Sequence, residues 1–106
     1  MPAYWIARAK ILDPVKYKRY ADQVPAILAR YGGRVLSRGA PYQTLEGPDT
    51  FERFVLIEFD SMDAARRCFE SPEYVAAAEH RRDGGGRNEL TIVEAGEGQI
   101  PRVENG

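Results

Sequence analysis

Hydrophobic and polar positions alternate with a period of two in several segments, and this pattern predicts β-strands. The first segment runs from Ala3 to Leu12, where every odd position is apolar. The most regular is residues 52–59, where Val55, Ile57 and Phe59 share one face with Arg53. Shorter strands are predicted over residues 34–38 and 89–95.

Two regions instead space their apolar residues three and four apart, as on one face of a helix. The first begins at Asp13-Pro14, a capping residue followed by a proline that suits the first helical position. It ends at Gly32-Gly33, and Pro25 predicts a kink or restart just before it. The predicted apolar face comprises Tyr17, Tyr20, Val24, Ile27 or Leu28, and Tyr31.

The second helical region carries two start signals, Ser61 and Ser71-Pro72. Its first segment is predicted to turn Met62, Ala65, Cys68 and Phe69 inward, and its second to run from Pro72 to Arg81. Three glycines at 84–86 cannot sustain a helix, so a hinge or loop is expected there.

The element order is therefore β-α-β-β-α-β, which predicts an α+β, ferredoxin-like domain over residues 1–95. Its four-stranded antiparallel sheet would carry the helices on one face, and residues 96–106 are expected to form a mobile tail. The other face would expose an apolar set interspersed with charges, and a homodimer formed through this face would cover it and leave a pocket between the sheets. That face is predicted to hold Tyr4, Ile6, Leu36, Phe54 and Leu56 among Arg8, Arg38 and Glu58.

A set of caps and turns in this order resembles the domain-of-unknown-function family numbered 1330, within the dimeric α/β-barrel superfamily. The motifs are Asp13-Pro14, Tyr31-Gly32-Gly33-Arg34, Arg38-Gly39, Leu45-Glu46-Gly47 and Ser71-Pro72-Glu73-Tyr74. The resemblance covers about residues 3–95 and implies a ferredoxin-like fold and a homodimer whose two sheets form a barrel. The superfamily contains cofactor-independent oxygenases, haem-degrading oxygenases, small isomerases and binding domains, so the fold does not choose a function.

Composition argues against several classes of function. Lys plus Arg is 15 and Asp plus Glu is 16, without the basic excess of a nucleic-acid-binding protein. Cys68 is the only cysteine and His80 the only histidine, and they form no metal-ligand spacing, so neither a metal nor another cofactor is expected. No segment approaches the ~20 apolar residues of a membrane span, and a charge interrupts the first apolar run. A cytoplasmic protein without a membrane partner is expected.

Four residues on the predicted uncovered face are candidates for ligand binding: Tyr4, Arg8, Arg38 and Glu58. An arginine there could hold a carboxylate or enolate, and Glu58 could move a proton. The alternative is that both arginines pair with Glu58 or Glu94 across the dimer interface. His80 is a second catalytic candidate, whose alternative is a surface charge at a helix end.

These observations predict a small homodimer that binds an anionic or aromatic molecule in a pocket between sheet and helices. Two alternatives stay open. One is a dimerisation or interaction module without chemistry. The other is a cofactor-independent oxygenase or isomerase, which would require Glu58, His80 and a tyrosine to converge.

Overall fold

The computed structural model describes residues 1–96, and the rest of the predicted tail lies outside the described residues. Its elements follow the predicted order, so the ferredoxin-like α+β fold is confirmed. Within the described residues no helix combines the length and apolar character needed to cross a membrane. The elements are β1 (Ala3–Ile11), α1 (Pro14–Arg30), β2 (Arg34–Arg38), β3 (Arg53–Phe59), α2 (Met62–Glu70), α3 (Pro72–His80), a π-helical turn (Arg81–Gly85) and β4 (Gly86–Glu94).

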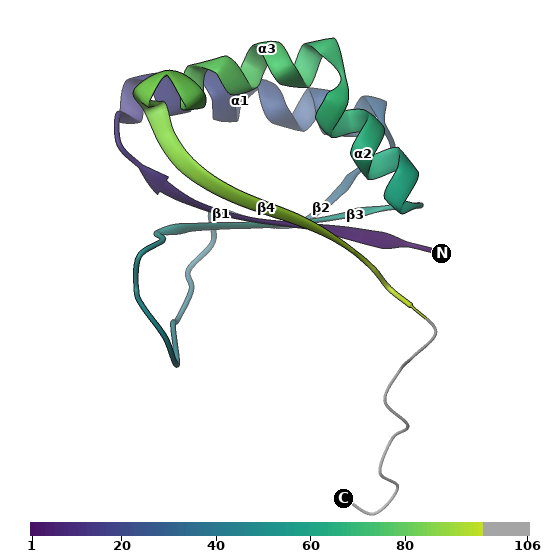
Figure 1. Cartoon of the computed structure of the whole chain (residues 1–106), viewed down its shortest axis with the longest axis horizontal. Helices are drawn as coiled ribbons and strands as arrows, with labels where there is room; N and C mark the ends of the chain where they lie inside the picture. Colours follow the sequence, from purple (N-terminus) through teal and green to yellow (C-terminus); the bar gives the residue numbers. More distant parts are fainter. Residues whose placement is uncertain (97–106) are drawn as a thin grey trace, which may run out of the picture.

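The four strands form one antiparallel sheet in the order β2-β3-β1-β4, with the three helices on one side of it (Figure 1). Central strand β1 places Trp5 opposite Ile57 of β3 and Ile92 of β4. Alternate residues therefore face the helices, on what we call the covered face, or point away from them, on the outer face.

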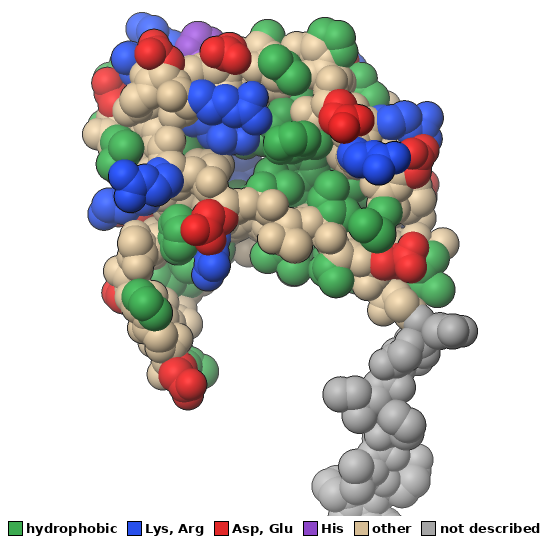
Figure 2. Space-filling model, viewed as in Figure 1, with side chains coloured by type: hydrophobic (Ala, Val, Ile, Leu, Met, Phe, Trp, Pro, Cys, Tyr) green, Lys and Arg blue, Asp and Glu red, His purple; other side chains and the backbone are tan. Residues whose placement is uncertain are grey.

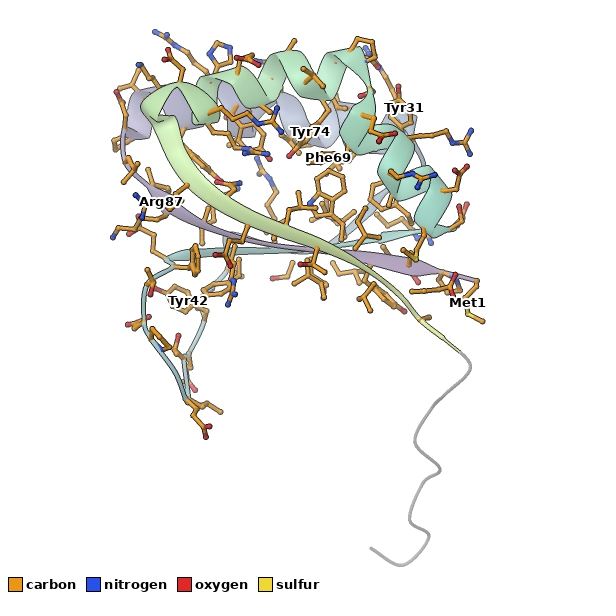
Figure 3. All side chains as sticks on the ribbon, viewed as in Figure 1. Met1, Tyr31, Tyr42, Phe69, Tyr74 and Arg87 are labelled. Carbon is orange, nitrogen blue, oxygen red and sulfur yellow. The ribbon has the colours of Figure 1, made fainter. Side chains whose placement is uncertain are left out.

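The core lies between the covered face and the helices. Trp5 is only 2% exposed, and its ring lies 5.8 Å from Phe59, 5.9 Å from Phe69 and 5.2 Å from Tyr74, measured between centroids. Phe69 and Tyr74 point from α2 and α3 into the space above the sheet (Figure 3). The predicted inward face of β3 is confirmed, since Ile57 and Phe59 are buried.

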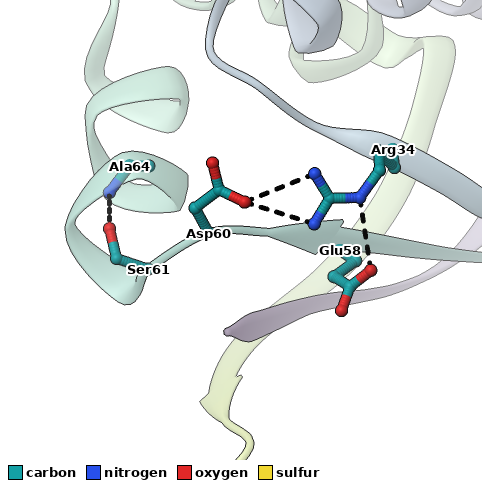
Figure 4. Close-up of polar contacts among 5 residues, drawn as sticks. All are labelled: Arg34, Glu58, Asp60, Ser61 and Ala64. Atoms are coloured by element: carbon teal, nitrogen blue, oxygen red, sulfur yellow. Dashed lines mark hydrogen bonds and ion pairs between the residues drawn. The ribbon is translucent and has the colours of Figure 1, made fainter. Parts of the chain in front are cut away.

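Each helix begins at the capping residue that the sequence predicts. Asp13 Oδ1 accepts hydrogen bonds from the backbone N–H groups of Val15 (3.0 Å) and Lys16 (3.2 Å). Ser61 Oγ accepts from Ala64 N at 3.0 Å (Figure 4), and Ser71 Oγ accepts a hydrogen bond of 3.1 Å at the start of α3. These bonds satisfy N–H groups that have no partner within the first helical turn.

Two local expectations were wrong, and one form of a third is excluded. Helix α1 runs through Pro25 as a single helix, so the helix does not restart there. Met62 is 42% exposed instead of inward, since it is the first residue of α2. Strand β4 begins at Gly86, three residues earlier than predicted, because β1 is long enough to pair Ile11 with that glycine.

A β-bulge in β2 changes which way Arg38 points. Val35 pairs with Ile57, but Ser37 pairs with Leu56 and Arg38 with Val55, so one extra residue is accommodated at Leu36. The bulge reverses the alternation of side chains after it. The prediction that Arg38 lies on the outer face was therefore wrong, and its side chain lies on the helical side of the sheet.

The outer face remains without cover within one chain. Three of its hydrophobic residues are strongly exposed: Ile6 (46%), Leu36 (53%) and Val93 (44%). Residues 39–52, which we call the arm, project from the sheet on this same side (Figure 1).

We expect Asp13→Ala to lower the free energy of unfolding by about 0.5–2 kcal/mol, because it removes both capping hydrogen bonds of α1. Denaturation in urea measures this change. Asp22→Ala is the control, since it removes only an exposed pair with Lys18 within α1 and should cost about 0.3–0.5 kcal/mol. Equal losses in the two variants would show that Asp13 does not act as a cap.

Candidate functional site

A small cavity lies between α1 and the covered face of the sheet. Trp5, Ala7 and Ala9 of β1 and Val55 and Ile57 of β3 line it from below, and Tyr17, Tyr20 and Val24 of α1 line it from above. The small side chains of Ala7 and Ala9 leave the cavity open, because larger side chains at these positions would fill the space between the sheet and α1. The enclosed volume is about 20 Å³, enough for one water-sized group.

The cavity continues into a wider surface depression of about 300 Å³ at the start of α1. Cavity and depression share Tyr17, Ala21, Arg38 and Arg53, so we call this depression the mouth. Figure 2 shows the molecule from the side of β4 and α3, where hydrophobic side chains lie between the helical layer and the sheet with Lys or Arg side chains beside them. Helix α1 and strand β2, which border the mouth, lie behind them in this view.

Two arginines from different strands stand at the mouth. Arg38 ends β2, and its Nη2 donates a 2.6 Å hydrogen bond to the backbone carbonyl of Ala21. Arg53 begins β3, and its guanidinium carbon lies 5.8 Å from the centre of the Tyr17 ring. Gly39 makes room for Arg53, because a Cβ at this glycine would lie 2.7 Å from Arg53 Nη1.

Neither arginine forms an ion pair with a carboxylate within residues 1–96. The one acidic residue that lines the mouth, Asp22, is held by Lys18 at 2.6 Å. The mouth therefore carries two guanidinium groups whose charge has no local counter-ion among the described residues. Such a site attracts an anion.

Beside the cavity, tyrosines are linked to a buried arginine. The hydroxyl oxygens of Tyr20 and Tyr74 lie 2.7 Å apart, and Arg81 Nη2 donates to Tyr74 Oη at 3.3 Å. Arg81 is only 7% exposed, and its guanidinium carbon lies 5.0 Å from the Tyr20 ring centre. Burial strongly raises the pKa of Tyr20, so this hydroxyl stays neutral and serves as a hydrogen-bonding group.

Tyr17 is positioned by β4. Asn88 Nδ2 donates a 3.4 Å hydrogen bond to Tyr17 Oη, and burial raises the pKa of Tyr17. The ring packs so closely on β4 that a Cβ at Gly86 would lie 2.6 Å from Tyr17 Cδ2. Asn88 Oδ1 is buried and has no hydrogen-bond partner among the described residues.

The other predicted ligand-binding residues lie on the outer face, and none of them lines the mouth, although Arg8 borders the small cavity. Arg8 pairs with Glu89 at 2.8 Å and lies 4.8 Å above the Phe51 ring. Tyr4 is paired with Glu58 across β1 and β3. Arg8 and Glu58 are four residues apart along the paired strands, about 13 Å, so one chain does not bring them together.

The partner of Glu58 within the chain is Arg34. Its Nε donates to Glu58 Oε1 at 3.3 Å, and its two terminal nitrogens donate to Asp60 Oδ1 at 3.3 Å (Figure 4). The pattern of the sequence does not predict this pair. It follows from the antiparallel register of β2 and β3, which places Arg34 opposite Glu58.

His80 lies at the end of α3, in a surface depression of about 460 Å³ that Lys16, Arg19 and Asp83 also line. The helical layer places it on the opposite side of the sheet from the Glu58 side chain. The described chain therefore does not assemble the Glu58, His80 and tyrosine combination that the oxygenase or isomerase alternative requires.

Sequence reasoning missed Arg53 as a site residue. Its signal is a charge on a strand face whose other members, Val55, Ile57 and Phe59, are apolar. A charged side chain is rarely buried in an apolar core, so Arg53 is expected to reach solvent or a polar site. It does so at the mouth, because Arg53 is the first residue of β3 and lies at the border of the core.

The described residues contain no cluster of three or more His, Cys, Asp or Glu side chains that could hold a metal ion. Cys68 is fully buried in the core, and burial raises its pKa to about 11. At neutral pH the thiol is therefore protonated and contributes packing.

Comparisons with known proteins place the chain among proteins of the same fold. A family model described as "Domain of unknown function (DUF1330)" matches residues 2–96, and no curated protein matches the sequence. A protein of unknown function from Rhodopseudomonas palustris superposes with a TM-score of 0.73 at 18% identity, over 91% of this chain and 83% of that one.

Two other solved structures are similar over most of their length. A dimeric protein of unknown function with a ferredoxin-like fold from Bacteroides fragilis gives a TM-score of 0.62 at 19% identity, over 88% of this chain and 95% of its own. SnoaB, a cofactor-independent oxygenase from Streptomyces nogalater, gives 0.61 at 19% identity, over 95% and 98%. At these identities the similarity shows a shared fold.

We expect Cys68 to react slowly with a thiol reagent such as dithionitrobenzoate in the folded protein at pH 8. The raised pKa alone lowers the thiolate fraction about a hundredfold relative to an ordinary thiol, and burial slows access further. The control is the same protein unfolded in guanidinium chloride, which should react rapidly. Equal rates would show that the thiol is accessible and reactive.

Proposed function

Because the chain belongs to the family of domains of unknown function DUF1330, whose name assigns no activity, we propose a function from the geometry of the cavity mouth. The protein binds a small organic anion with an apolar or aromatic body between α1 and the sheet. The observation that carries this proposal is the placement of Arg38 and Arg53, without a carboxylate partner in residues 1–96, at the mouth of an apolar cavity.

The two arginines suit a carboxylate because guanidinium groups donate planar pairs of hydrogen bonds to both carboxylate oxygens. Arg38 already donates to the Ala21 carbonyl, so its orientation at the mouth is fixed before a ligand arrives. A held donor loses less conformational entropy on binding than a free one.

The size of the site limits the ligand. The mouth, at about 300 Å³, lies at the lower end of the range of ligand sites, about 300–1,000 Å³. The enclosed cavity accepts only a group of about one methyl or water. A molecule of about one ring with one carboxylate fits these limits, with its apolar edge directed toward Trp5.

The lining favours binding over acid–base catalysis. The described residues around the cavity include no Asp, Glu, His or Cys, and the Tyr20 hydroxyl is neutral. The one carboxylate at the mouth, Asp22, is paired with Lys18. A general base needs a group that can accept a proton near neutral pH.

The same proposal includes a homodimer formed through the outer face. Ile6, Leu36 and Val93 are strongly exposed there, as is typical of a surface that another subunit covers. The similar Bacteroides fragilis protein is described as dimeric. In such a dimer Tyr4, Arg8 and Glu58 lie near or in the interface between the two sheets.

Benzoate serves as a probe of the cavity mouth, and the fluorescence of Trp5, the only tryptophan, reports its binding. We expect Arg38→Ala and Arg53→Ala each to weaken benzoate binding at least about tenfold, since a hydrogen bond to a charged group contributes about 1.5–3 kcal/mol. Neutral benzamide should bind weakly to all forms. Arg66→Ala, on the surface of α2, is the matched control and should leave the affinity unchanged.

Thermal unfolding separates this role from a structural one. Arg38→Ala leaves no carboxylate without a partner, so its melting temperature should stay close to that of the wild type. A large fall would assign Arg38 to stability, and unchanged benzoate affinity in both arginine variants would refute the binding proposal.

We expect Ile6→Glu to convert the dimer into a folded monomer, since it places two like charges in the centre of the proposed interface. Light scattering at micromolar concentration measures the mass. Val15→Glu, at a position that is 63% exposed on α1, should leave the dimer intact. A monomeric wild type, or a dimer broken only by the helical variant, would contradict this interface.

A further inference from the structure

The arm, residues 39–52, is long for a connection between neighbouring antiparallel strands. It contains no helix or strand and extends beyond the sheet on the side opposite the helices (Figure 1). Connections longer than about a dozen residues without secondary structure are uncommon in small domains and usually have a function.

Several contacts fix the base of the arm to the sheet. The Tyr42 ring lies 4.7 Å from that of Phe54, on the side away from the helices (Figure 3). Phe51 lies beneath the Arg8 guanidinium, 4.8 Å from its carbon. Glu52 donates through its backbone N–H to Ala9 O at 2.9 Å and accepts at Oε1 from the N–H of residue 11 at 2.8 Å. The direction in which the arm projects is therefore set by the outer face.

The tip of the arm presents a hydrophobic side chain to solvent. Leu45 is 91% exposed, more than any other large hydrophobic residue in the described chain. The tip is shaped by a turn at Gly47, which has a φ of +98°, and by a 3.3 Å hydrogen bond from Thr44 Oγ1 to Asp49 Oδ1. The turn and the hydrogen bond fix the backbone at the tip, yet no part of the described chain buries the Leu45 side chain.

We propose that the arm packs on a second copy of this chain and that Leu45 is buried there. The inference rests on the proposed dimer through the outer face, since the arm projects on the side where that second copy lies. A two-fold dimer repeats every contact, so both arms would engage at once. Each arm would extend past the edge of its own sheet and reach the partner.

The arm also connects the two arginines of the cavity mouth. It begins directly after Arg38 and ends directly before Arg53, and Gly39 N donates to Phe54 O at 3.1 Å where the two strands separate. Packing of the arm on the partner fixes this point and with it the spacing of the two guanidinium groups. Anion binding and assembly are therefore coupled, and linkage requires that each strengthen the other.

Sedimentation equilibrium of Leu45→Ser tests the docking. Because the contact occurs twice per dimer, a variant that weakens the contact of each arm tenfold raises the dimer dissociation constant about a hundredfold. Val15→Ser, an equally conservative change at an exposed position of α1, should leave it unchanged. Both residues are exposed in the single chain, so circular dichroism should show both variants folded.

A wild-type dimer whose dissociation constant is the same in Leu45→Ser overturns the arm contact while the outer-face dimer stands. A monomeric wild type overturns both. Equal weakening by Val15→Ser also overturns the arm contact, because it would show a general effect of lost surface hydrophobicity.

Benzoate titrations test the coupling separately. The affinity of Leu45→Ser should fall at protein concentrations where the variant is monomeric and recover where it is dimeric. If the benzoate affinity of Leu45→Ser does not depend on whether the variant is dimeric, the coupling between anion binding and assembly is wrong, while the contact between the arm and the partner still stands. If the wild type does not bind benzoate, both the coupling and the proposed ligand are wrong, and sedimentation equilibrium still tests the contact of the arm.

Discussion

The alternation of side chains across the sheet is the constraint on which the rest of this structure depends. With helices on one side only, every strand residue belongs either to the covered face or to the outer face. Trp5, Ile57 and Phe59 form the core because of it, and Ile6 and Val93 are left exposed because of it. The core, the cavity and the uncovered surface are thus three results of one period-two pattern.

The same constraint explains how far the sequence could predict the site. Alternation in β1 and β3 is regular, so the fold, the caps and the outer-face residues of these two strands followed from residue types alone. Arg38 could not be placed in this way, because the bulge at Leu36 depends on how β2 pairs with β3 and leaves no local signal. The start of β4 at Gly86 was missed for a related reason, since a glycine extends a strand there only because β1 supplies its partner.

Five of the arginines fall into two groups according to their partners. Arg8 and Arg34 lie on the outer face or the sheet edge and are matched by Glu89, Glu58 and Asp60. Arg38, Arg53 and Arg81 lie on the helical side around the tyrosines, and no ion pair joins them to a carboxylate within residues 1–96. The formal net charge of the whole chain, −1, does not reveal that these paired and unpaired arginines lie on different sides of the sheet. Local potential at the cavity mouth is therefore positive although the protein is slightly acidic.

Alternation finally connects the two surfaces that would otherwise act independently. Arg53 faces the cavity mouth and the next residue, Phe54, faces outward against Tyr42 of the arm. Consecutive residues of one strand cannot move separately by much, because the paired backbone of β1 holds both. A contact that holds Phe54 in place on the outer face therefore also holds the guanidinium of Arg53 at the mouth. A β-sheet is a single layer of backbone, so the side chains of its two faces share the same backbone positions. The position of Arg53 at the mouth therefore depends on the contacts that Phe54 makes on the outer face.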